Sequence, residues 1–132
     1  MNSEVNILLN IFGDQFEPDD ISAQIDVKPS RIVFKGTNLG CNRPIQQQSC
    51  WSYETGYTEV YDVNDVMIKL LTIFEKKTDK INELKEEYSL STSLDIVIRI
   101  KNGNVPALYF NHETINFIHD IDASVDVDLY IC

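Results

Sequence analysis

The first residues that could do chemistry lie in the stretch GDQFEPDDIS, residues 13–22, which holds four carboxylic acids: Asp14, Glu17, Asp19 and Asp20. Clustered carboxylates bind Ca2+ in an EF-hand, but that loop alternates its acids around a central glycine and ends on a glutamate. Pro18 instead suits the first turn of a helix, whose positive end favours acids. The stretch therefore predicts a helix start and not a calcium site.

Two aspartates near the C-terminus are the next candidates. Asp126 and Asp128 alternate along an expected strand, so their carboxylates share one face, about 7 Å apart. A divalent ion held there needs further ligands, which the sequence does not identify. A solvated strand face, or a contact with a partner, explains the pair better than a metal site does.

Histidines and cysteines offer a third possibility, a zinc site. His112 and His119 lie on one side of an expected helix, and the chain has three cysteines: Cys41, Cys50 and Cys132. The first two cysteines are too far apart for a zinc knuckle, which separates its cysteines by about two to four residues. We therefore expect neither a metal nor a cofactor.

No catalytic arrangement is recognisable in the sequence. A Cys–His nucleophile pair lacks the flanking pattern that accompanies such pairs. The chain also has no glycine-rich loop that could cradle a phosphate. We expect a protein that is not an enzyme, and we assign no catalytic residue.

The charge of the chain narrows the classes of partner. Its 132 residues carry 21 acids and 11 bases, for a formal net charge of -10 at pH 7. All bases lie between Lys28 and Lys101, so residues 1–27 and 102–132 are acidic without any base. Nucleic acids and anionic membranes both need clustered Lys and Arg, so we expect neither as a partner. A basic protein suits this charge.

The sequence also indicates a compartment. It has no run of about 18 apolar residues, the length that predicts a membrane-spanning helix. The N-terminus, MNSEVNILLNIFGD, lacks the basic and apolar regions of a signal peptide. An odd number of cysteines without an export signal favours reduced thiols. We expect a cytoplasmic protein.

Period-two alternation and capping signals divide the chain into elements. In the first half they predict a strand over residues 5–12 that ends at Gly13, a short helix from Pro18, and strands over residues 31–36 and 49–56. The stretch between these last two strands, residues 37–48, is predicted to be a long loop because it is rich in Gly, Asn, Pro and Gln.

In the second half, Asp62 is expected to cap a helix with apolar residues at 3–4 spacing up to Phe74. Thr78 or Asp79 caps a second helix, unless the pair forms one helix bent near Lys77. The remaining predicted elements are a strand over residues 93–101, an Asn-Gly turn, a return strand over residues 105–110, a short helix capped by Asn111 and a strand over residues 124–132.

With the two middle helices counted as one, these elements run in the order β-α-β-α-β-β-α-β, with an optional extra strand near residue 33, so we expect a single α+β domain over residues 1–132. Clean alternation predicts a mainly antiparallel sheet with helices on one face only. This is a two-layer sandwich that resembles the ferredoxin-like plan. On the last strand, alternation directs four apolar residues toward the helices: Val125, Val127, Leu129 and Ile131.

The uncovered face of the sheet is the expected interaction site. Alternation places Leu8, Phe12, Val97 and Tyr130 on it, among polar and charged neighbours: Asn6, Asn10, Asp95, Arg99, Asp126 and Asp128. An apolar centre with a polar rim has the anatomy of a protein interface. In the rival interpretation, loop 37–48 or the strand with Trp51 folds over this face and buries it.

Several short motifs occur in a fixed order along the chain: FGDQFEPDDI, IDVKPS, FKG, the Trp in WSY, a long apolar helix and ASVDVDLY. Together they resemble the bacterial family called domain of unknown function 4279, over nearly the whole chain. The residues that carry the resemblance are Gly13, Asp14, Phe16, Pro18, Ile21, Pro29, Ser30, Lys35, Gly36, Trp51, Asp126, Asp128 and Tyr130. The segment 37–48 has no counterpart. The resemblance implies a small bacterial cytoplasmic domain without an established activity.

Two functions are compatible with these features. The first is a protein-binding domain, in the form of an immunity-like protein that neutralises a basic toxin, since small families of this kind often sit beside toxin genes. Its partner-binding residues are Leu8, Phe12, Val97, Asp126, Asp128 and Tyr130, and the same face could join two copies in a homodimer. The alternative is a small-ligand or metal-binding domain that uses the exposed sheet face or the 37–48 loop, with Trp51, Tyr53 and the Asp126/Asp128 pair as candidates. Trp51 and Tyr53 fit core or sheet packing better than a ligand platform.

Overall fold

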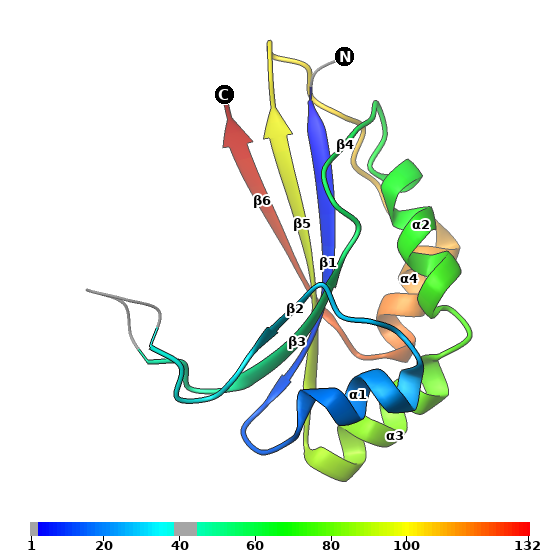
Figure 1. Ribbon diagram of the computed structural model, residues 1–132. Coiled ribbons are helices and arrows are strands. Elements are labelled where there is room, and N and C mark those ends of the chain that lie inside the picture. Colours follow the sequence, from blue (N-terminus) through cyan, green and yellow to red (C-terminus); the bar gives the residue numbers. More distant parts are fainter. Residues whose placement is uncertain (1–2, 39–44) are drawn as a thin grey trace.

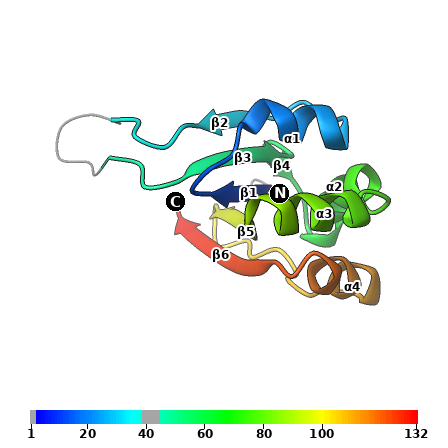
Figure 2. The same cartoon turned by 90° about the horizontal axis from the view of Figure 1, so that it is seen from below.

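The computed structural model describes residues 3–38 and 45–132, and it has the α+β architecture that the sequence predicts. Helices lie on one side of a mixed sheet (Figure 1), and Figure 2 shows the two layers from below. The strands are β1 (Glu4–Gly13), β2 (Arg31–Val33), β3 (Ser49–Glu54), β4 (Thr58–Glu59), β5 (Ser91–Ile100) and β6 (Ser124–Ile131). The helices are α1 (Pro18–Ile25), α2 (Asn64–Phe74), α3 (Thr78–Tyr88) and α4 (His112–Asp120).

Strand β1 is the centre of the sheet. The strand order is β2-β3-β1-β5-β6, and the short β4 also pairs with β1. The strand pairs are antiparallel except β5 and β6, which run parallel. The sheet is therefore mainly antiparallel, as predicted. The ferredoxin-like plan is not confirmed, because the last strand joins the edge of the sheet in parallel.

The apolar core lies between the sheet and the helices. Ile7 and Ile96 of the two central strands are fully buried, and so is Phe74 of α2. The Trp51 ring meets Phe74 edge-on, with ring centroids 6.3 Å apart. Trp51 Nε1 donates a hydrogen bond to Ser22 Oγ at 2.9 Å. This bond satisfies the buried indole N–H and fastens α1 to β3.

The turn after β1 confirms that the first acidic cluster serves a helix start. Pro18 occupies the first turn of α1, where Asp19 and Asp20 follow as exposed residues. A Cβ at Gly13 would lie 2.6 Å from Leu90 Cδ2, so the Leu90 side chain would have to shift to accept it. The sequence around this turn is thus set by packing and by the helix dipole.

A side-chain cap starts one further helix at the predicted place, whereas the predicted cap of α2 is wrong. Asn111 Oδ1 accepts a hydrogen bond from the Thr114 N–H at 3.0 Å and so caps α4. Asp62 is not the N-cap of α2, because that position is Val63, which has no side-chain cap bond. Asp62 Oδ1 instead accepts a hydrogen bond from the Asn64 N–H at 2.9 Å in the turn that precedes the helix. The helices α2 and α3 are separate and not one bent helix. In the described residues no helix is both long and apolar enough to cross a membrane.

The predicted return strand over residues 105–110 is wrong. β1 already occupies one edge of β5 and β6 the other, so β5 offers no edge for a returning strand. After a turn closed by a bridge between Lys101 and Asn104, the chain leaves the sheet. Ala107 then bonds to the segment before α2, through its N–H to Tyr61 O at 2.8 Å.

Strand β6 corrects a second expectation. Its register aligns Leu129 with the buried Ile98, so its apolar residues do face the helical side. They are nevertheless uncovered: Val127 is 40% exposed, Leu129 59% and Ile131 86%. Figure 1 shows α4 beside the first half of β6 only. The alternation predicted the direction of these side chains correctly but not their burial.

Candidate functional site

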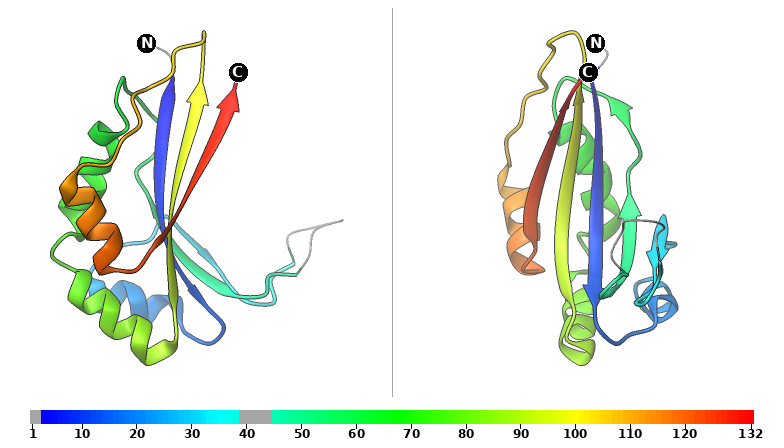
Figure 3. Two further views of the ribbon diagram at one scale, coloured as in Figure 1. Left: turned by 180° about the vertical axis from the view of Figure 1, so that it is seen from behind. Right: turned by 90° about the vertical axis from the view of Figure 1, so that its left-hand side faces the viewer.

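The side of the sheet that faces away from the helices, called the open face below, is the candidate functional site. The right-hand view of Figure 3 looks onto it, with β6 at one edge and β2 at the other. The left-hand view shows the β2–β3 arm projecting away from the helices, which makes this face concave. Its side chains are Arg31, Val33, Cys50, Ser52, Glu54, Asn6, Leu8, Asn10, Phe12, Ser93, Asp95, Val97, Arg99, Asp126, Asp128 and Tyr130.

A row of hydrogen bonds crosses the centre of the open face. Asn10 lies between Ser52 and Ser93 in the strand register. Ser52 Oγ donates to Asn10 Oδ1 at 2.6 Å, and Asn10 Nδ2 donates to Ser93 Oγ at 3.1 Å and to Asp95 Oδ2 at 2.8 Å. Only 9% of Asn10 is exposed. Because a buried amide is costly without partners, this row holds β3, β1 and β5 in register.

Three carboxylates gather beside this row. The register sets Asp126 opposite Asp95, and Asp128 opposite Val97. Burial is the main cause that raises the pKa of Asp95; the hydrogen bond from Asn10 opposes it, and the charges of Asp126 and Asp128 raise the pKa further. This edge of the open face therefore concentrates negative charge, which a cationic group of a partner would neutralise.

A shallow depression on the open face lies between β3 and β6. Its volume is about 390 Å³, and it is lined by Asn6, Leu8, Glu54, Tyr57, Val97, Arg99 and Tyr130. The Arg99 guanidinium carbon lies 3.6 Å from the centre of the Tyr57 ring, a cation–π contact. The depression thus combines an apolar floor with a positive charge held in place.

A second depression, of about 320 Å³, lies beside the first and shares Leu8 with it. Arg31, Val33 and Gln46 of the β2–β3 arm form one side of it, and Phe12 lines it from β1. The described part of the arm therefore borders the open face without burying Phe12, which stays partly exposed. Residues 39–44 of the predicted 37–48 loop lie outside the described residues.

The structure brings the predicted partner-binding residues together on this one face: Leu8, Phe12, Val97, Asp126, Asp128 and Tyr130. The first three are partly buried, and the last three are exposed, with Tyr130 at 55%. The grouping by face is therefore as predicted. Their role in binding a partner stays a prediction.

The polar neighbours differ from the expectation. Asn6 and Asn10 were expected to be exposed, but only 5% and 9% of their surfaces are accessible. Asn6 Oδ1 accepts a hydrogen bond from the Gly56 N–H at 2.9 Å, so the chain after β3 covers it. Sequence reasoning also missed Arg31 as a member of this face. Its alternation with Ile32 was visible, but the pairing of β2 with β3 was not.

The ligand candidates Trp51 and Tyr53 require a correction. Both lie on the helical side of β3, where Trp51 is fully buried and the Tyr53 ring centroid is 5.4 Å from that of Phe74. They cannot form a ligand platform on the exposed sheet face. An aromatic pair at period two is equally compatible with either face of a strand, and only the packing against α2 decides between them.

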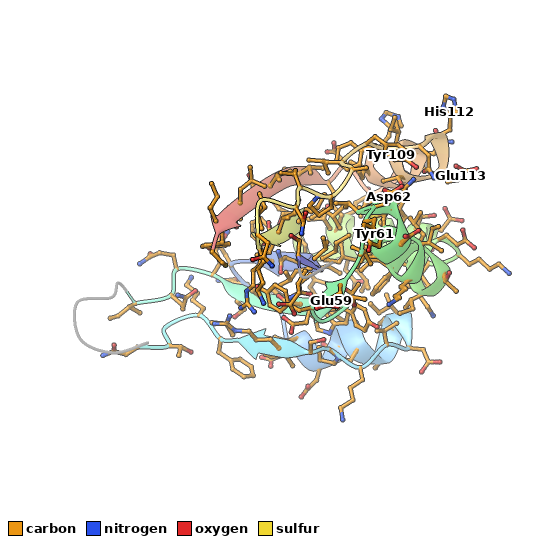
Figure 4. All side chains as sticks on the ribbon, turned by 90° about the horizontal axis from the view of Figure 1, so that it is seen from above. Glu59, Tyr61, Asp62, Tyr109, His112 and Glu113 are labelled. Atoms are coloured by element: carbon orange, nitrogen blue, oxygen red, sulfur yellow. The ribbon has the colours of Figure 1, made fainter. Side chains whose placement is uncertain are left out.

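A second group of polar side chains surrounds the loops before α2 and α4 (Figure 4). The Tyr109 hydroxyl donates to Asp62 Oδ2 at 3.0 Å. His112 points outward from α4, away from Asp62. In residues 3–38 and 45–132 no three His, Cys, Asp or Glu side chains are arranged to hold a metal ion. Neither this group nor the Asp126/Asp128 pair forms a metal centre there.

The described cysteines and the histidines lie on different elements, with Cys50 on β3, Cys132 after β6, and both histidines on α4. Cys50 is partly buried on the open face, and burial raises the pKa of its thiol, which keeps it protonated at neutral pH. Cys132 is exposed as a free thiol. Cys41 lies outside the described residues.

Comparison with known proteins supports the motif order seen in the sequence. A comparison with curated proteins and one with solved structures give no significant match. A family model does match, and it covers residues 3–132. The matched range contains every strand and helix described above, including the whole open face. The chain therefore belongs to the family described as Domain of unknown function (DUF4279).

Proposed function

We propose that this protein is a protein-binding domain that captures a basic protein through its open face. The observation that carries the proposal is the carboxylate strip of Asp95, Asp126 and Asp128 beside the partly exposed apolar residues Leu8 and Val97. An apolar centre next to concentrated charge of one sign fits a partner with the opposite charge.

Electrostatics supports a basic partner over a neutral one. The chain has a net charge of -10, and burial already disfavours the charged form of Asp95. A Lys or Arg side chain placed near Asp95 would stabilise its carboxylate and relieve the repulsion from Asp126 and Asp128. Opposite charges also accelerate the encounter between two proteins. Salt weakens this effect, because at physiological ionic strength it screens charges that are more than about 8 Å apart.

In its most specific form the proposal is a cytoplasmic, bacterial, immunity-like protein that neutralises a basic toxin by covering it. Binding alone can block an active surface, so this role needs no catalytic residue and no cofactor. The neighbouring genes provide a direct check. A gene for a basic toxin beside this one would support this form, and its consistent absence across related genomes would contradict it.

Partner capture from native lysate tests the broader proposal. The test variant neutralises the strip, with Asp95→Asn, Asp126→Asn and Asp128→Asn. A matched control makes the same change in charge at exposed residues of the helical layer, with Glu75→Gln, Glu86→Gln and Glu113→Gln. The wild type and the control should retain one basic protein at low salt and release it at high salt, while the test variant retains none. Equal capture by all three proteins would overturn the proposal.

The depression around Arg99 supports a second candidate, the binding of a small anionic ligand. The Tyr57 ring holds the guanidinium in place, and the neighbouring Val97 offers apolar contact. A ligand that binds only the folded state raises the thermal midpoint. A thermal-shift screen with anionic metabolites should show a rise that Arg99→Gln abolishes. If no compound shifts the midpoint, this candidate fails.

A further inference from the structure

The outer edge of β6 has unpaired backbone groups in the described structure. β6 is the last strand in the sheet order, with β5 on its inner side. The Cys132 N–H donates to Ile100 O at 2.8 Å, so Cys132 directs its backbone groups toward β5. These groups alternate in direction along a strand. Tyr130 and Asp128 therefore also bond toward β5, and Val127, Leu129 and Ile131 direct their N–H and C=O groups outward.

Apart from the charges of Asp126 and Asp128, this edge lacks the features that protect exposed strands. Natural edges are blocked by Lys, Pro, bulges or short length, because a long flat edge pairs with other chains. The sequence of β6, SVDVDLYI, contains neither Lys nor Pro, and its eight residues pair with β5 in unbroken register. Its apolar row is also uncovered, with Leu129 59% and Ile131 86% exposed. The strand therefore has the features of a site for an added strand.

Charge indicates which strand would fit. On the open-face side, β6 presents Asp126 and Asp128, with Asp95 beside them on β5. No salt bridge to either aspartate is formed within the described residues, although Arg99 lies on the same face opposite Tyr130. In a sheet, side chains of paired residues lie side by side on the same face. An added strand therefore fits best when its alternate residues are basic on the open face and apolar beside Leu129 and Ile131.

A second copy of the chain is a poorer occupant of the same edge. Antiparallel pairing of two β6 strands about Val127 would set Asp126 against Asp128 twice. Pairing about Asp128 would set the two Asp128 carboxylates directly opposite each other. Pairing about Leu129 would set Asp128 against Tyr130, but it would still gather four carboxylates on one face. Like charges across strands are destabilising, so self-pairing conflicts with the charge of this edge.

We propose that the basic partner binds by adding an extended segment, in which Lys or Arg alternates with Val, Ile or Leu, to the outer edge of β6. The inference rests on the proposed function and specifies how the partner docks. Backbone bonds to Val127, Leu129 and Ile131 would supply affinity, as in other complexes formed by β-strand addition. Contacts of its basic residues with Asp126 and Asp128 would supply specificity.

The test uses the full chain and synthetic peptides of one composition. The first peptide repeats Lys-Val, and the second repeats Lys-Lys-Val-Val, so that its lysines fall on both faces of a strand. The first should bind more tightly and slow amide hydrogen exchange at Val127, Leu129 and Ile131. The variant Asp126→Lys with Asp128→Lys should weaken that binding by about tenfold or more and should favour a Glu-Val peptide instead.

A backbone variant separates the edge from the open face. The Leu129 N–H points away from β5, so Leu129→Pro removes an outward donor without breaking the pairing with β5. Leu129→Ala is the matched control, since it shortens the side chain but keeps the donor. Leu129→Pro should abolish binding of the Lys-Val peptide, whereas Leu129→Ala should weaken it only slightly.

The outcomes distinguish this inference from the proposed function. If neutralising the acidic strip abolishes capture of the natural partner but Leu129→Pro does not, the open face binds the partner and the added strand is wrong. If neither change affects capture, both proposals fail. Equal binding of the two lysine peptides would overturn the inference. Protection of the β6 edge amides from hydrogen exchange that rises with protein concentration, without any peptide, would also overturn the inference. That result would identify a second copy of the chain as the occupant of the edge.

Discussion

Replacing Asn10 with alanine tests the idea that a buried polar row organises the open face. The change removes two hydrogen bonds with the hydroxyls of Ser52 and Ser93 and one with the Asp95 carboxylate. A neutral bond contributes about 1 kcal/mol and a bond to a charged group about 1.5–3 kcal/mol, which together give about 3.5–5 kcal/mol. Water can replace some of these bonds at the partly exposed Asp95. We therefore expect Asn10→Ala to lower the free energy of unfolding by about 2–4 kcal/mol.

The same substitution should change how stability depends on pH. The hydrogen bond from Asn10 lowers the pKa of Asp95 against the larger, opposite effect of burial, so its removal raises this pKa further. A carboxyl group whose pKa is raised by folding binds its proton more tightly in the folded state. The stability that such a carboxyl group contributes is therefore present at low pH. It is lost as the pH rises from the pKa of the group in the unfolded chain through its higher pKa in the folded protein. The loss caused by Asn10→Ala should therefore be larger at neutral pH than at a pH below the folded pKa of Asp95.

Urea denaturation at neutral and at acid pH, followed by far-UV circular dichroism, measures both effects. Asn82→Ala is the control, since Asn82 is an exposed asparagine that donates one bond, to Asp120 O at 2.7 Å. Asn82→Ala should lower the free energy of unfolding by at most about 1 kcal/mol, and this loss should not depend on pH. An Asn10→Ala loss no larger than that of the control, or one that is the same at both pH values, would refute the reasoning.

Three further predictions concern the open face of the sheet and the packing of the sheet against the helices. Asp95→Asn should stabilise the protein at neutral pH relative to acid pH, because it removes a buried charge yet can still accept the bond from Asn10; paired urea titrations at the two pH values would show this gain. Phe12→Ser combined with Tyr130→Ala should keep cooperative unfolding but abolish partner capture; unfolding at much lower urea would instead show that this face is part of the core. Trp51→Phe should lower stability by about 2 kcal/mol, since it removes buried volume and the bond to Ser22 Oγ; a circular-dichroism midpoint equal to that of the wild type would contradict this.

Much of the architecture could be predicted from the sequence because local patterns report local geometry. Period-two alternation identified β1, β5 and β6 and assigned their faces. Pro18 and Asn111 marked the starts of α1 and α4, because a missing N–H and a side-chain acceptor both satisfy the first helical turn. The order of weak motifs also sufficed to indicate the family.

The composition of the open face was predictable only in part. Leu8, Val97 and Tyr130 were assigned to it correctly, because alternation fixes the direction of each side chain. The membership of Arg31 required knowledge of strand pairing, and the burial of Asn10 required knowledge of its partners on β3 and β5. Neither is encoded in spacing along one strand.

The sequence by itself therefore determined most of the strands and helices, though not the short β4, and it determined which side of a strand each residue faces and how acidic the chain is. The tertiary structure alone decided that residues 105–110 are not a strand, since both edges of β5 are occupied. It also decided that Trp51 belongs to the core and that Leu129 does not. The physical reason is that direction is a property of the local backbone, whereas burial depends on which distant element lies opposite. Leu129 is 59% exposed, whereas Trp51 is fully buried and packs against Phe74 of α2.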